Sequence, residues 1–91
     1  MGQTATYCAA ANGRANILQV LIESGARIDV VDNQGNTPAH AAAKYGRQQC
    51  ILVLTQNGAD FNVKNNQDKT PLDMAKSDEM KALLENSVPF K

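Results

Sequence analysis

The feature that most constrains this chain is an internal repeat, in which residues 2–32 recur as residues 35–65. When the two stretches are aligned without a gap, 11 of 31 positions are identical. A third copy repeats the second at the same interval, through the pairs Asn33–Asn66, Gln34–Gln67, Thr37–Thr70, Pro38–Pro71 and Ala42–Ala75. The interval is 33 residues, from residue 2 to residue 35. Repeats of this length are typical of architectures in which small helical units stack and bury a shared core.

The copies define one domain of 91 residues with three parts. We place the first repeat at residues 1–33, the second at 34–66 and a shortened third at 67–91. Alignment of Leu83–Leu84 with Leu54–Thr55 requires that four residues be missing from the third copy, between Ala75 and Met80. With little more than two full units, we expect a free energy of unfolding below roughly 8 kcal/mol, measurable by urea denaturation.

The second copy shows how each unit is built. Thr37 is a good N-cap and Pro38 suits the first helical position, so the alanine-rich residues 39–45 predict a short helix that ends at Gly46. A second helix with an apolar stripe follows in each copy. The stripe residues are Ile17, Leu18, Leu21 and Ile22, then Cys50, Ile51, Leu54 and Thr55, then Met80, Leu83 and Leu84. Asn, Asp and Gly in residues 26–35 and 59–68 predict turn-bearing loops.

The interval and the stretches TPAHAAA, TPLDMA and GADFN resemble the ankyrin repeat. The resemblance runs from Gly2 to about Glu85. It implies an all-α fold, an ankyrin-repeat solenoid of stacked helix-turn-helix units with protruding β-hairpin-like loops. In this family the motif histidine bonds backbone or hydroxyl groups of its own and adjacent repeats, which implies a structural role for His40. Tyr7 and Asp73, which replace it in the other copies, can also form hydrogen bonds.

The two ends of the array differ. We predict a short, charged last helix capped by Ser77, with residues 86–91 frayed. The first helix, residues 5–12, is as apolar as an internal one and leaves an apolar face without a neighbour. We therefore expect a monomer that is the C-terminal portion of a longer array. The alternative is that two chains stack end to end through this face.

Composition argues against several function classes. The nine basic and nine acidic residues balance, and nothing indicates the clustered basic face of a nucleic-acid-binding protein. No apolar run approaches the ~20 residues needed to span a bilayer, and there is no basic leader before an apolar stretch. The two cysteines form no C-x-x-C pair, so we expect two buried thiols. These features predict an intracellular protein, cytoplasmic or nuclear, without membrane insertion.

Catalysis is not expected. His40 and Cys50 could form a base and a nucleophile, but Cys50 lies in the apolar stripe, where a thiol is inert. A single histidine provides no zinc-binding cluster, and single glycines provide no phosphate-binding loop. We predict a protein that is not an enzyme and that has no cofactor and no metal site.

The resemblance implies that the chain binds a protein partner through its loop tips and inner helix face. The candidate residues are those without a turn, cap or core role: Gln3, Ala11, Asn12, Asn33, Gln34, Asn36, Lys44, Tyr45, Asn66, Gln67 and Lys69. Tyr45 is the best candidate anchor, because interface hot spots favour Tyr over amide side chains. The alternative function is that of a structural spacer or end-cap in a larger multidomain protein whose activity lies elsewhere.

Asn62 is a separate candidate. In this family a GADxN segment can be a substrate for asparagine hydroxylation, and the GADFN segment fits that pattern. The simpler interpretation, which we favour, is that Asn62 caps the turn.

Overall fold

The structure is a computed structural model that describes residues 5–87. This part of the chain forms α-helices and contains no strand, which confirms the all-α prediction. The helices are α1 (Ala5–Ala11), α2 (Ala15–Glu23), α3 (Pro38–Lys44), α4 (Gln48–Gln56), α5 (Pro71–Met74) and α6 (Asp78–Ser87).

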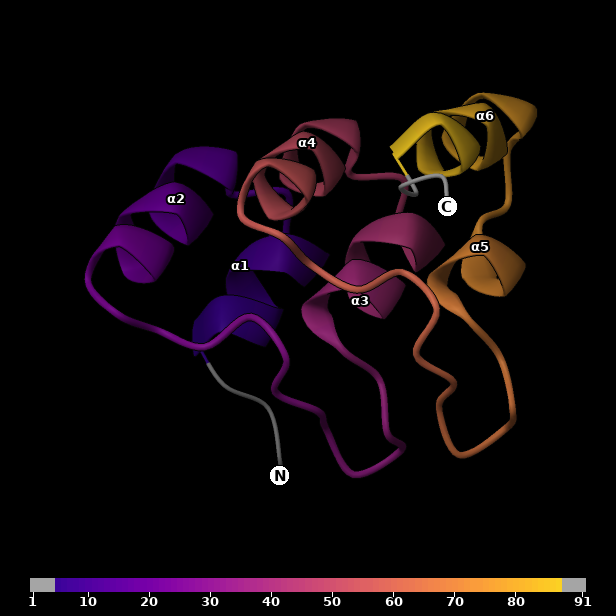
Figure 1. Cartoon of the computed structure of the whole chain (residues 1–91), viewed down its shortest axis with the longest axis horizontal. Helices are drawn as coiled ribbons and strands as arrows, with labels where there is room; N and C mark the ends of the chain where they lie inside the picture. The colour runs from indigo at the N-terminus through magenta and orange to yellow at the C-terminus, as the bar shows by residue number, and fades with distance from the viewer. Residues whose placement is uncertain (1–4, 88–91) are drawn as a thin grey trace.

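The helices lie in two rows (Figure 1). In the first row α3 packs between α1 and α5, and in the second row α4 packs between α2 and α6. The loops after α2 and α4 extend past the first row, away from the second row. A continuous apolar core lies between the rows, and its fully buried members include Ala10, Leu18, Ala42, Ile51, Leu54, Met80 and Leu84.

The central helix α3 shows why this sequence packs so closely. Its residues 38–43 are all buried, and the four alanines among them allow α1 and α5 to approach on either side. Thr37 and His40 form a capping box at its start: the Thr37 hydroxyl accepts from His40 N–H at 3.3 Å, and His40 Nδ1 accepts from Thr37 N–H at 3.1 Å. Gly46 follows the helix with φ of 70°, a left-handed conformation that stops it.

The third helix pair differs from its predicted form. α5 begins at Pro71, which is one full repeat interval after Pro38, the first residue of α3. The same interval counted from Gln48, the first residue of α4, leads to Lys81, but α6 begins three residues earlier, at Asp78. Three residues are therefore missing, and the expected four is wrong. The loss falls in α5, which has four residues against seven in α3. With this offset Leu84, fully buried, takes the place of Leu54, and Leu83 is only partly buried.

The last helix was also predicted too short. α6 has ten residues against nine in α4, and it continues through Asn86 and Ser87, which were expected to be frayed. Ser77 caps it as predicted, because its hydroxyl accepts from Met80 N–H at 3.0 Å. Residues 88–91 lie outside the described range.

Two residues of the first helix pair are exposed where the sequence predicted burial. Cys8 is exposed, and Ile17 is 54% exposed. Their counterparts one repeat later, Ala41 and Cys50, are 1% and 0% exposed. The reason is the number of neighbours: in the described structure α3 and α4 are flanked on both sides, whereas α1 and α2 are flanked on one side only.

Candidate functional site

Tyr45 lies at the C-terminal end of α3, in the first helix row. Its ring is 50% exposed, and Lys44 Nζ lies 5.4 Å from the ring centroid, within cation–π range. Its backbone is fixed, because its N–H donates to the Ala41 carbonyl at 3.0 Å and the chain turns at Gly46. The helix end therefore holds an aromatic side chain at the surface.

Two shallow hollows share Tyr7 and Tyr45 in their walls. One, of about 270 Å³, lies toward the loop tip and also includes Asp32, Asn33 and Lys44. The other, of about 330 Å³, lies toward the end of α1 and includes Ala11, Asn12 and Arg47. Tyr45 thus stands between two concave surfaces, an arrangement suited to contact with a protruding partner segment.

Asp32 places a fixed negative charge in the first hollow. One carboxylate oxygen accepts from Gln34 N–H at 2.8 Å and from Asn36 N–H at 2.9 Å, and the Tyr7 hydroxyl also donates to this carboxylate. Burial alone would raise the pKa of Asp32, but these hydrogen bonds hold it below its ordinary value. Burial, together with Asp32, raises the pKa of Tyr7 to about 12, so the phenol stays protonated as a donor.

The tips of the two loops are hydrogen-bonded to each other. Asn36, 6% exposed, accepts from Asn65 Nδ2 at 2.7 Å. Asn66 donates its backbone N–H to the Gln34 carbonyl at 2.9 Å, and its side chain to the Asn33 carbonyl at 3.1 Å. Asn36 is therefore a structural residue between the loops, and we leave it out of the candidate surface.

The other candidate residues lie as follows. Asn12, Asn33, Gln34, Tyr45, Asn66, Gln67 and Lys69 are exposed, and Ala11 and Lys44 are partly buried. Gln3 lies outside the described residues. The structure gathers Asn33, Gln34 and Lys44 with Tyr45 around the first hollow, whereas Gln67 and Lys69 belong to the next loop.

Sequence reasoning missed three residues of this site: Tyr7, Asp32 and Arg47. Tyr7 was interpreted as a replacement for the motif histidine, and Arg47 recurs as Arg14 and so resembled scaffold. The available signal was the size of Tyr7, because a phenol extends further than an imidazole and can contribute to a surface.

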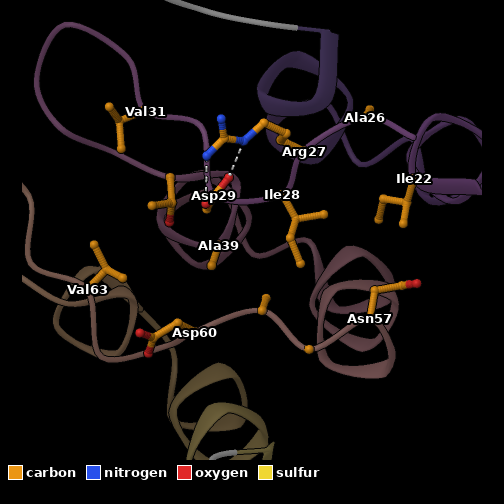
Figure 2. A pocket seen from close by; sticks show the side chains of 13 residues that line it. Ile22, Ala26, Arg27, Ile28, Asp29, Val31, Ala39, Asn57, Asp60 and Val63 are labelled. Atoms are coloured by element: carbon orange, nitrogen blue, oxygen red, sulfur yellow. Dashed lines mark hydrogen bonds and ion pairs between the residues drawn. The ribbon is translucent and has the colours of Figure 1, made fainter. Parts of the chain in front are cut away.

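A third and larger hollow opens between the extended segments after α2 and α4 (Figure 2). It measures about 640 Å³, has Ile28 and Ala39 on its floor, and has the ion pair of Arg27 and Asp29 at its rim. One repeat later, the larger Phe61 and Leu72 stand at the positions of Ile28 and Ala39. The smaller side chains of Ile28 and Ala39 fill less of the space between the two segments.

Asn62 lies in the segment after α4. Its side chain is exposed, and its backbone N–H donates to Asp60 Oδ1 at 2.8 Å. Asp60 therefore caps this turn, and the prediction that Asn62 caps it is wrong.

His40 and Cys50 are both inside the molecule. His40 is 0% exposed, and its Nε2 donates to the Lys69 carbonyl at 2.8 Å, as expected for a structural joint. Burial lowers the pKa of His40 and raises that of the Cys50 thiol, so both are held in their neutral forms. Within residues 5–87, no three His, Cys, Asp or Glu side chains are grouped so as to hold a metal ion.

None of the helices in residues 5–87 combines the length and the apolar character needed to cross a membrane.

A comparison with curated proteins found no match for the chain. The sequence model of a family described as ankyrin repeats, in three copies, matches residues 1–65, which is more than half of the chain. Beyond that match, Thr70 and Asp73 form at α5 the same capping box as Thr37 and His40 form at α3. By this match and by its stacked helix pairs, the chain belongs to the ankyrin repeat family.

Proposed function

We propose that this chain is a non-catalytic protein–protein interaction module that binds its partner through the loop tips and the inner helix face. Ankyrin repeats are generally protein–protein interaction modules and are typically not catalytic. The observation that carries the proposal is Tyr45, a half-exposed aromatic side chain that separates two hollows. Tyr is enriched among the residues that dominate binding energy at interfaces.

The proposed contact surface joins the exposed candidates to the residues that line the hollows. It consists of Asn12, Asn33, Gln34, Lys44, Tyr45, Asn66, Gln67 and Lys69, with Tyr7 and Arg47 added. Gln3 stays a predicted contact residue outside the described residues. Amide side chains supply both donors and acceptors, so this surface suits a partner segment with polar groups around one apolar side chain that packs on Tyr45.

We infer that the domain is a short solenoid of three repeats, 1–33, 34–66 and 67–91, which functions as a monomer inside the cell. The fixed loop pair supports the proposed binding mode, because ordered loops lose less conformational entropy on binding than mobile ones. Cys50, a free buried thiol, supports a reducing compartment, either cytoplasm or nucleus.

A photo-crosslinking amino acid tests the surface directly. Placed at position 45 it should capture a partner from cell extract, whereas at Leu52, which is 38% exposed on α4 in the second row, it should not. Once that partner is purified, Tyr45→Ala should weaken binding by about tenfold or more and leave the urea midpoint unchanged. Unchanged affinity would refute the anchor role.

The spacer function predicts a different outcome from the same experiment. A passive spacer or end-cap in a larger protein would yield no captured partner at position 45, at the loop position Gln67 or at Leu52. That result would favour the spacer over the interaction module.

A further inference from the structure

The 640 Å³ hollow between the segments that follow α2 and α4 is separate from the surface around Tyr45 (Figure 2). It shares no lining residue with the two hollows beside that tyrosine. Its volume lies within the range of pockets that bind ligands in proteins, roughly 300–1,000 Å³. We call it the inter-segment hollow, and it is bounded by residues 26–31 on one wall and residues 57–63 on the other.

Both walls have the side-chain alternation of a half-buried extended segment. Along residues 26–31, and again along residues 59–64, exposed side chains alternate with partly or fully buried ones. The inward-facing residues are Ala26, Ile28 and Val30 on one wall and Ala59, Phe61 and Val63 on the other. A period of two residues is that of an extended chain, whose two backbone edges are open to hydrogen bonding.

The backbone groups of these walls are largely unpaired within the described chain. No backbone N–H or carbonyl of residues 27–31 or 60–64 bonds to another backbone group there. On the second wall, the Asn62 N–H donates to the side chain of Asp60, and the backbone of Val63 interacts with His40. Extended segments with unpaired edges are the surfaces to which a peptide adds as a further strand.

The spacing of the two walls suits one inserted chain. The walls follow α2 and α4, which pack against each other. Packed helices lie about 8–10 Å apart and paired strands about 4.8 Å apart, so segments that continue from neighbouring helices are separated by about two strand spacings. In the described structure no hydrogen bond joins residues 27–31 to residues 60–64. A single extended chain between the walls would therefore lie within reach of both.

The floor and the rim of the hollow set the chemistry of that chain. Ile28 and Ala39 form an apolar floor, which suits an aliphatic side chain (Figure 2). At the rim, the Arg27 guanidinium is already paired with Asp29, through two bonds of 3.0 and 3.1 Å. Asp60, on the opposite wall, is exposed and forms no ion pair with the described residues. The charge that complements this rim is therefore a cation.

We propose that the inter-segment hollow binds an extended peptide of a partner protein, in which an aliphatic residue adjoins a lysine or an arginine. The aliphatic side chain packs on Ile28 and Ala39, and the basic side chain beside it pairs with Asp60, because successive side chains of an extended chain point in opposite directions. The peptide backbone bonds to the unpaired groups of the walls. This site is independent of the function proposed for the surface around Tyr45.

The next repeat supplies a variant that fills the floor. Phe61 and Leu72 occupy the positions that correspond to Ile28 and Ala39, and Phe61 is buried. Ala39→Leu therefore introduces the side chain that this chain carries one repeat later. It should occupy the hollow and exclude the aliphatic side chain of the peptide, while the chain still unfolds cooperatively in urea.

A peptide library tests the site without a known partner. Random heptapeptides displayed on phage are selected on the full chain, and those that also bind Asp60→Lys are removed. The remaining peptides should place an aliphatic residue next to Lys or Arg. Synthetic copies should bind Ala39→Leu at least tenfold more weakly than the original chain, and Glu79→Lys, the same charge change at an exposed position of α6, within twofold of it. A selection that leaves no peptide, or peptides that bind Ala39→Leu and the original chain equally, would overturn the proposal.

Hydrogen exchange tests the extended binding mode. In the complex with a selected peptide, backbone amides of residues 27–31 or 60–64 should exchange at least tenfold more slowly than in the chain alone. The amides of Asn33 and Gln34, at the loop tip, should exchange at the same rate in both. Unchanged exchange along both walls would overturn the proposal. Light scattering that shows the chain alone to be a dimer, and Asp60→Lys a monomer, would assign the hollow to a second copy instead.

Discussion

His40 donates its Nε2–H to the carbonyl of Lys69 at 2.8 Å, and this bond joins α3 to the loop that precedes α5. The other ring nitrogen, Nδ1, accepts from Thr37 N–H at 3.1 Å and lies 2.8 Å from the Thr37 hydroxyl. These partners require a neutral imidazole with its proton on Nε2, because a proton on Nδ1 would face the N–H of Thr37. The hydrogen-bonded contact that His40 makes between two repeats is therefore sensitive to pH.

We predict that the chain loses stability between pH 7.5 and pH 5.5 because of His40. Burial lowers its pKa in the folded state below the ordinary value of about 6.5, so the unfolded state binds the proton more readily. The stabilisation is present above that value and is lost as the pH falls through the folded pKa. Urea denaturation at the two pH values measures the loss, and His40→Gln, which does not titrate, should abolish the difference.

Three carboxylates with shifted pKa values do not titrate in this window. The pKa values of Asp29, Asp32 and Asp73 are lowered from 3.8, so these carboxylates remain charged throughout the range. A drop of the same size in His40→Gln and in the original chain would show that another group is responsible.

We predict that Tyr7→Phe destabilises the fold by about 1–2 kcal/mol, the usual cost of removing a hydrogen bond to a charged acceptor. The change removes the hydroxyl group that donates to the partly buried Asp32 carboxylate, while the aromatic ring of this buried residue, 7% exposed, stays in place. Tyr45→Phe is the matched control, since its ring is half exposed and its loss of a hydroxyl should cost little. Equal urea midpoints for the two variants would contradict a specific role for the Tyr7–Asp32 contact.

The local parts of this fold could be predicted from the sequence. The cap at Thr37, the start of the helix near Pro38 and the stop at Gly46 follow from rules that act within a few residues. The structural role of His40, which forms hydrogen bonds within its own repeat and to the next one, followed from the family resemblance. Repetition strengthened each of these predictions, because the same pattern recurred in a neighbouring repeat.

The parts that failed depend on neighbours. Cys8 and Ile17 have the residue types of buried positions, but burial requires a helix on the other side, which the described structure does not place there. Asn36 resembles a surface amide until a second loop brings Asn65 within 2.7 Å. The third copy was misaligned because a helix of four residues still begins with an intact capping box.

We predict that Asp68→Gly stabilises the chain by about 0.5 kcal/mol or more. Asp68 has φ of 66°, in the left-handed region that costs a residue with a Cβ about 1–2 kcal/mol, partly offset by the greater freedom of Gly when unfolded. Its ion pair with Lys64, at 3.6 Å and with both side chains mostly exposed, contributes little. Gly35→Ala, the opposite change at the equivalent turn, should destabilise the chain. Urea midpoints that shift in the same direction for both variants would contradict this account.

We predict that Asn36 and Asn65 are energetically coupled across the two loops. Asn36→Ala should cost about 1–3 kcal/mol, because it leaves the buried Asn65 Nδ2 without its closest acceptor. Asn33→Ala is the control: its side chain is exposed and only its backbone carbonyl accepts from Asn66, so a change within about 0.5 kcal/mol is expected.

A double-mutant cycle isolates the contact from the other roles of these residues. Asn65 also accepts from Gln67 and Lys69 N–H, so Asn65→Ala alone should cost more than Asn36→Ala. The double variant should then lose less than the sum of the single losses, by about 0.5–1 kcal/mol or more. If the two losses simply add, the 2.7 Å contact contributes nothing of its own, and the loops are held together by the backbone bond from Asn66 to Gln34.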